Sequence, residues 1–99
     1  MAENKIAAYL GLARRAGKLA LGVNVASACK GGVYLLVADE AASENTKKEI
    51  AKLARRFDCP VVWTEDLETL TGKDYCKLAA VREENLASAI RKVSEREGE

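Results

Sequence analysis

The sequence predicts an α/β fold, a three-layer α/β/α sandwich with a small four-stranded central sheet. Segments with apolar residues at helical spacing alternate with short apolar runs, and glycines or the single proline stand at many of the boundaries. Helices that alternate with buried strands pack on both faces of a sheet. The 99 residues, 48% apolar and 31% charged, are typical of one soluble globular domain. We therefore expect a single domain over residues 1–99, in the order α-β-α-β-α-β-α-β-α.

The N-terminal third predicts a helix, a short extended piece and a second helix. Apolar residues recur at helical spacing over about residues 4–16, and Gly17 follows as a stop signal. Residues 19–21 form the extended piece. Asn24 is expected to cap the second helix, which Lys30 ends.

The middle of the chain predicts a strand, a long helix and another strand. Residues 33–38 form a continuous apolar run, which is typical of a strand buried on both faces. Ser43 is a candidate N-cap for the next helix, whose apolar side chains follow helical spacing: Ile50, Leu53, Ala54 and Phe57. Pro60 then opens a strand over residues 61–64, at a position where its missing N–H is tolerated.

The C-terminal third predicts three more elements. A short helix is expected over residues 66–70, with Gly72 ending it. Residues 76–81 read as a fourth strand. The last helix runs from Glu83 to about Arg96, with acidic residues at its start and basic residues near its end, as the helix dipole favours.

Several classes of chemistry are excluded or disfavoured by composition. Histidine is absent, and the cysteines are widely spaced, so neither a zinc site nor a disulfide is expected, and the three thiols should pack as small hydrophobes: Cys29, Cys59 and Cys76. No nucleotide-binding glycine motif is present. Asp39 and Glu40 could form an acid/base pair or hold Mg²⁺, but such carboxylates are more often solvated or cap the next segment. We expect a non-enzymatic protein without metal or cofactor.

Targeting signals are also missing. No basic segment followed by an apolar one opens the chain, and the longest uncharged run, residues 19–29, is too short to cross a membrane. The expected location is the cytoplasm.

The charge distribution is uneven, although the net charge is only +1. Residues 1–33 contain five basic residues and one acidic residue, whereas the remainder contains eleven basic and fourteen acidic residues. A basic N-terminal third indicates a local surface for a polyanion, and a solvated helix face is the alternative.

Three segments resemble the ribosomal protein L-seven-Ae family, and more narrowly its small bacterial, kink-turn-binding-protein-like members. They are LGLARRAGKLALG at residues 10–22, VYLLVADEAASENTKKEIAKLARRFDCPVV at residues 33–62, and DLETLTGK at residues 66–73. The resemblance implies a ribosomal RNA-binding protein of this fold that recognises structured RNA.

The resemblance also implies where RNA would bind. The family uses a G-x-N-E-x-x-K motif at the start of its second helix, and Gly22 and Asn24 match its glycine and asparagine. The resemblance therefore implies RNA contact over the segment of Gly22, Val23, Asn24 and Val25. Val25 and Ala28 replace the glutamate and the lysine, which are the motif's charged readers of the RNA. Lys30 is only a partial substitute, because it lies at a different azimuth of the helix.

A second RNA-facing loop is implied at Ala80, Val81 and Arg82, where apolar residues would pack on an unstacked nucleotide. Val81 could equally be a strand end. We expect phosphates to be neutralised by the basic cluster of the N-terminal third: Arg14, Arg15, Lys18 and Lys30.

Two functions remain open from the sequence. The first is a non-enzymatic, ribosome-associated protein that docks rRNA or another kink-turn-like RNA through its second helix. The second is a protein–protein module on the same fold, which would bind a partner or a second copy through the apolar helix face of Val23, Val25 and Ala28. An apolar patch on this face favours the module, whereas a positive rim around Asn24 favours RNA.

Overall fold

The computed structural model describes the backbone of residues 2–97 and the side chains of residues 5–95. Over this part of the chain, helices and strands follow the predicted order. They are α1 (Ala2–Arg15), β1 (Leu19–Leu21), α2 (Val23–Ala28), β2 (Leu35–Asp39), α3 (Glu44–Phe57), β3 (Val61–Thr64), α4 (Leu67–Thr71), β4 (Leu78–Val81) and α5 (Glu84–Glu97).

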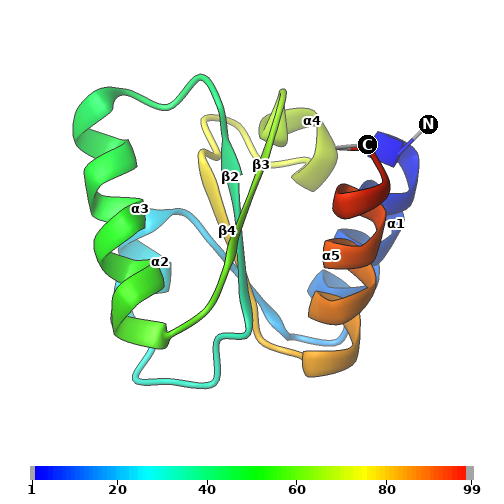
Figure 1. Cartoon of the computed structure of the whole chain (residues 1–99), viewed down its shortest axis with the longest axis horizontal. Coiled ribbons are helices and arrows are strands. Elements are labelled where there is room, and N and C mark those ends of the chain that lie inside the picture. Colours follow the sequence, from blue (N-terminus) through cyan, green and yellow to red (C-terminus); the bar gives the residue numbers. More distant parts are fainter. Residues whose placement is uncertain (1, 98–99) are drawn as a thin grey trace.

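The elements form the predicted three-layer sandwich around a four-stranded mixed sheet. Figure 1 shows α2 and α3 on one face of the sheet and α1, α4 and α5 on the other. The strand order is β1-β4-β2-β3; β2 and β3 run parallel, and β4 is antiparallel to both β1 and β2. β4 therefore lies inside the sheet, although it is the last strand in the sequence.

The core consists of two apolar clusters, one on each face of the sheet. All five residues of β2 and all four of β4 are buried. Alternation along β2 sends Leu35 and Val37 toward α1, α4 and α5, and Leu36 and Ala38 toward α2 and α3. Burying one such leucine or valine stabilises the fold by about 1.5–3 kcal/mol.

The best-predicted element is α3. Ser43 caps it as expected, because its Oγ accepts a hydrogen bond from the N–H of Thr46 at 3.1 Å. The helix ends at Phe57, and Asp58 adopts the left-handed conformation with a φ of 53°. Pro60 then precedes β3, as the sequence indicates.

The second helix lies where the sequence predicts it, between Gly22 and Gly31, but its cap residues differ from the expectation. The N-cap of α2 is Gly22, and Asn24 is an exposed residue inside the helix that makes no capping hydrogen bond. Gly22 has φ 97° and ψ 154°, a conformation that is nearly restricted to glycine. The chain therefore passes from β1 into α2 at Gly22, two residues before Asn24.

The C-terminal end of α2 is set by a contact with α3. The Arg56 guanidinium donates hydrogen bonds to the carbonyls of Ser27, at 2.9 Å, and of Cys29. These carbonyls would otherwise have no partner at the end of a helix. The helix ends at Ala28, and Lys30 lies beyond it rather than in its last turn.

The cysteines differ in burial, and the two adjacent carboxylates behave as the commoner alternative predicts. Cys76 is buried, whereas Cys29 and Cys59 are half-buried, and all three are free thiols. Asp39 is only 2% exposed, so it is not solvated. Its carboxylate instead caps the backbone that follows it, by accepting from the N–H of Ala41. Glu40 is exposed.

Candidate functional site

A surface hollow of about 380 Å³ lies beside the N-terminal end of α2. Residues from β1, α2, α3 and the loop between α4 and β4 line it: Leu21, Gly22, Val23, Asn24, Val25, Thr46, Lys73, Tyr75 and Lys77. Four of these, from Gly22 to Val25, are residues that the sequence assigned to RNA binding.

The Gly22 turn forms one wall of the hollow. Its N–H donates to the Leu78 carbonyl of β4 at 2.7 Å, and its carbonyl accepts from the N–H of Ala26 at 3.0 Å. Both polar groups of Gly22 are thus held by the fold. The next residues of α2 face outward, because Asn24 is exposed and Val25 is 50% exposed.

The opposite wall is the loop between α4 and β4, which the sequence did not assign to the site. Tyr75 in this loop is 88% exposed and has a φ of 59°. Lys73 Nζ donates to the Leu21 carbonyl at 3.3 Å and lies 3.8 Å from the position that a Cβ on Gly22 would take. The loop therefore reaches across to β1 and places an aromatic ring and an ammonium group beside Asn24.

Lys77 is held in place by the buried carboxylate of Asp39, at 3.7 Å. Asp39 also accepts hydrogen bonds from the N–H groups of Ala41, at 2.7 Å, and Leu67, at 3.0 Å. Burial acts to raise the pKa of Asp39, but these two N–H groups and the Lys77 ammonium together lower it below its ordinary value. Because Asp39 balances Lys77, Lys73 is the more available cation of the hollow.

The sequence did contain a signal for this loop. An aromatic residue between two lysines, at positions 73, 75 and 77, is a combination that nucleic-acid-binding surfaces use. From the sequence, this segment is predicted only as the end of a short helix and the start of a strand.

The remaining predicted residues do not join the hollow. Ala80 and Val81 are completely buried in β4, so the prediction that they contact a nucleotide is wrong. The physical reason is the place of β4 between β1 and β2, with helices on both faces. The alternative, that Val81 is a strand end, is confirmed.

The predicted basic cluster is divided. Arg14 donates to the Thr71 carbonyl at 2.7 Å and so joins α1 to the end of α4. Arg15 is exposed. Lys18 and Arg82 pair across β1 and β4 at the end of β1 opposite Gly22, where the N–H of Arg82 donates to the Lys18 carbonyl at 2.8 Å.

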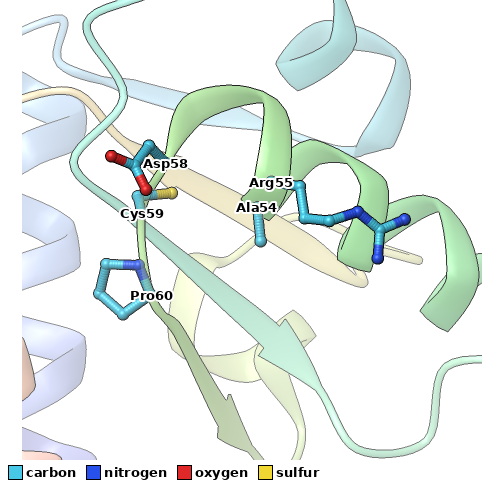
Figure 2. A pocket seen from close by; sticks show the side chains of 5 residues that line it. All are labelled: Ala54, Arg55, Asp58, Cys59 and Pro60. Carbon is cyan, nitrogen blue, oxygen red and sulfur yellow. The ribbon is translucent and has the colours of Figure 1, made fainter.

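A second hollow, of about 420 Å³, is lined by Ala54, Arg55, Asp58, Cys59 and Pro60 (Figure 2). Burial and the Asp58 carboxylate raise the pKa of the Cys59 thiol. In Figure 2 the Arg55 side chain extends away from Cys59 and Pro60. The thiol therefore lacks the cationic neighbour that activates a nucleophilic cysteine.

The described part of the chain holds neither a metal-binding cluster nor a membrane-spanning helix. Within residues 5–95, no group of three or more histidine, cysteine, aspartate or glutamate side chains could hold a metal ion. None of the helices described is long and apolar enough to cross a membrane.

No protein-family model and no curated protein matches this chain. A solved structure from Bacillus halodurans, described as a protein with unknown function, is similar to it with a TM-score of 0.76. The similarity covers 92% of this chain and 97% of that chain, at 22% sequence identity. A likeness at this identity shows a shared fold.

Proposed function

We propose that the protein binds structured RNA without catalysing a reaction, as a cytoplasmic, ribosome-associated protein that uses the hollow at α2. The observation that carries the proposal is the juxtaposition of exposed Tyr75 and the Lys73 ammonium with exposed Asn24 across one hollow. The resemblance of the sequence to kink-turn-binding proteins supports the same conclusion and names kink-turn-like RNA, including rRNA, as the partner.

Each side chain of the hollow matches one part of a nucleotide. The Tyr75 ring offers a stacking face for an unpaired base. The Asn24 amide can donate to and accept from a base edge, and the Lys73 ammonium can pair with a phosphate. Because α2 has only six residues, the lysines rather than the helix dipole supply most of the positive charge.

The two missing charged readers lower the expected specificity. A good bidentate base contact discriminates by about 1–3 kcal/mol, and neither Val25 nor Ala28 can form one. We therefore expect binding that depends on stacking and on phosphate contacts, and that weakens as salt rises.

The test is a binding titration of a kink-turn RNA and of a continuous duplex of matched length, over a salt series. Tyr75→Ala should weaken binding by roughly ten- to a hundredfold, since stacking on an aromatic side chain is worth about 1–3 kcal/mol per base. Lys73→Gln should weaken it most at low salt.

Trp63→Ala and Lys92→Gln are the matched controls, because they remove an exposed aromatic ring and an exposed charge outside the hollow. Both should bind like the wild type. Absence of saturable binding by the wild type, or equal losses in the controls, would contradict the proposal.

The alternative function, a protein–protein module, is favoured by one observation. Val25 is half exposed, Ala28 is exposed, and Val23 is half-buried beside them on α2. Restoring the charged readers by Val25→Glu with Ala28→Lys separates the two functions. A large gain in kink-turn affinity favours an RNA-binding scaffold, whereas no gain favours a face committed to a protein partner.

A further inference from the structure

We propose a second phosphate-binding surface, formed by Lys18, Lys30 and Arg82 at the end of β1 opposite the hollow. It would bind the backbone of the same RNA molecule, an inference that rests on the RNA binding proposed above. The surface would extend the contact beyond the nucleotide held at Tyr75.

Two exposed cationic side chains, Lys18 and Arg82, lie side by side just beyond the paired ends of β1 and β4. The register continues one residue beyond the Leu19–Val81 pair, because the N–H of Arg82 donates to the Lys18 carbonyl at 2.8 Å. Adjacent strands lie about 4.8 Å apart, so the two residues are neighbours. On the other side of β4, the N–H of Tyr34 donates to the carbonyl of Val81, the residue before Arg82, at 2.9 Å.

The Lys18 and Arg82 side chains share one face of the sheet. The residues two positions along each strand, Ala20 and Ala80, belong to the core beneath α2 and α3. By alternation, Lys18 and Arg82 point to that same face. The Arg82 guanidinium also donates to the Gly31 carbonyl at 3.4 Å, in the segment that follows α2. Because Gly31 comes directly after Lys30, this contact brings Arg82 near Lys30.

The positive charge of this surface lacks a carboxylate partner. The ion pairs among the described residues are Lys52–Glu49, Lys77–Asp39 and Arg91–Glu95, none of which includes a member of the surface. The adjacent Glu83 carboxylate instead accepts from the N–H of Leu86 at the start of α5. Like charges opposite each other on neighbouring strands repel, so an anion between Lys18 and Arg82 would stabilise the pair.

Arg56 adds a further positive charge near Lys30, at the C-terminal end of α2, where its guanidinium donates to the Ser27 and Cys29 carbonyls. A guanidinium and an ammonium side by side suit the oxygens of a phosphodiester. Tyr34 is 43% exposed, and its backbone is bonded to Val81, the residue before Arg82, so its ring is a candidate stacking face near the cations. Cations combined with an exposed ring favour a nucleic acid over a small phosphate compound.

The spacing of the two surfaces fits one RNA strand. Four residue steps separate Lys18 from Gly22, which is about 13 Å at about 3.3 Å per residue. Successive nucleotides in a duplex strand advance by roughly 3 Å, so a few nucleotides cover this distance. One RNA molecule with a base at the hollow is therefore long enough to place a phosphate at Lys18 and Arg82.

The experiment measures the salt dependence of binding to the kink-turn RNA. Each neutralised phosphate adds roughly 0.7–0.9 to the slope of log affinity against log salt concentration. Lys18→Gln with Arg82→Gln should lower this slope by about 1–2. Tyr75→Ala should weaken binding at every salt concentration and leave the slope unchanged, because stacking releases no counterions.

Arg91→Gln with Lys92→Gln is the control, because it removes the same charge from α5, on the other face of the sheet (Figure 1). Its slope should equal that of the wild type. A wild-type slope in the Lys18/Arg82 variant, or an equal fall in the control, would overturn the second surface and leave RNA binding at the hollow intact. A wild type that binds no RNA would overturn both proposals.

Amide NMR shifts of the wild-type protein keep the inference testable if the double variant fails to fold. Addition of the RNA should shift the amides of Lys18, Tyr34 and Arg82 as well as that of Tyr75. Shifts confined to Tyr75 and its neighbours would sink the second surface.

Discussion

At the scale of single residues, Gly22 does most to shape the candidate site. Its φ of 97° and ψ of 154° let the chain leave β1 and enter α2 within one residue. The same residue leaves room for Lys73, whose ammonium lies 3.8 Å from the position of a Cβ there. A side chain at position 22 would strain the backbone and crowd this lysine.

Gly22→Ala should lower the free energy of unfolding by about 1–3 kcal/mol, the cost of a non-glycine residue in this conformation. Urea denaturation measures the change. Gly11→Ala is the matched control, since Gly11 lies inside α1 with nothing within 4 Å of the added Cβ. That control should gain about 0.5–1 kcal/mol, and a loss as large as that of Gly22→Ala would refute the argument.

Asp39 makes stability depend on pH. Its pKa in the folded protein is lowered, so the stabilisation is fully present above the ordinary value of 3.8 and is lost as the pH falls through the lower folded value. Asp39→Asn should cost about 1–3 kcal/mol at pH 7 and should flatten the loss of stability in acid. Urea midpoints between about pH 2.5 and 7 measure both effects.

The exposed Asp74→Asn is the control for Asp39, and it should leave the acid dependence unchanged. If Asp39→Asn instead keeps the full acid dependence of the wild type, another carboxylate must be responsible.

At the scale of secondary structure, α2 is too short to be stable alone, and both of its ends are held by other elements. The Gly22 N–H binds β4 at one end, and Arg56 of α3 binds the carbonyls of Ser27 and Cys29 at the other. This explains why a helix of six residues can present Asn24 and Val25 at a defined position.

Arg56→Ala should loosen α2 and leave the core intact. We expect faster amide hydrogen exchange over residues 26–30, by roughly tenfold for a loss of about 1.4 kcal/mol, with little change in β2 or β4. The neighbouring Arg55→Ala makes the control, because Arg55 is exposed and forms none of these hydrogen bonds. Unchanged exchange in α2 would show that Arg56 does not hold its end.

At the scale of the whole molecule, β4 determines which residues can reach a ligand. It is the last strand in the sequence but lies between β1 and β2, so every one of its side chains is buried. Its ends remain accessible: the loop before it carries Lys73 and Tyr75, and Arg82 follows it. The two proposed surfaces therefore lie at opposite ends of one central strand.

Ala80→Leu tests this placement. The added volume enters the packed core beneath α2 and α3, and it should cost about 1–3 kcal/mol. Ala28→Leu, at an exposed position of α2, should stay within about 0.5 kcal/mol of the wild type. A neutral Ala80→Leu would mean that the position is open to solvent.

Most of the element order could be predicted because its signals are local. Ser43 capped α3 as expected, Pro60 preceded β3, and Gly72 ended α4. The caps of α2 were not predicted, because Gly22 is held by Leu78 and Ser27 by Arg56, partners 56 and 29 positions away along the chain. The prediction of one basic cluster failed for the same reason, because Arg14 is held by Thr71 and Lys18 by Arg82, which are also distant in the sequence.

The class of the fold and the succession of helices and strands follow from the sequence alone, since periodicity, caps and turn residues act between neighbours. The strand order does not, and it is the strand order that buried Ala80 and Val81 and brought Tyr75 beside Asn24. The pairing of Lys18 with Arg82 likewise depends on tertiary contacts. Such contacts join segments far apart in the chain, and they form when both faces of the sheet are buried together.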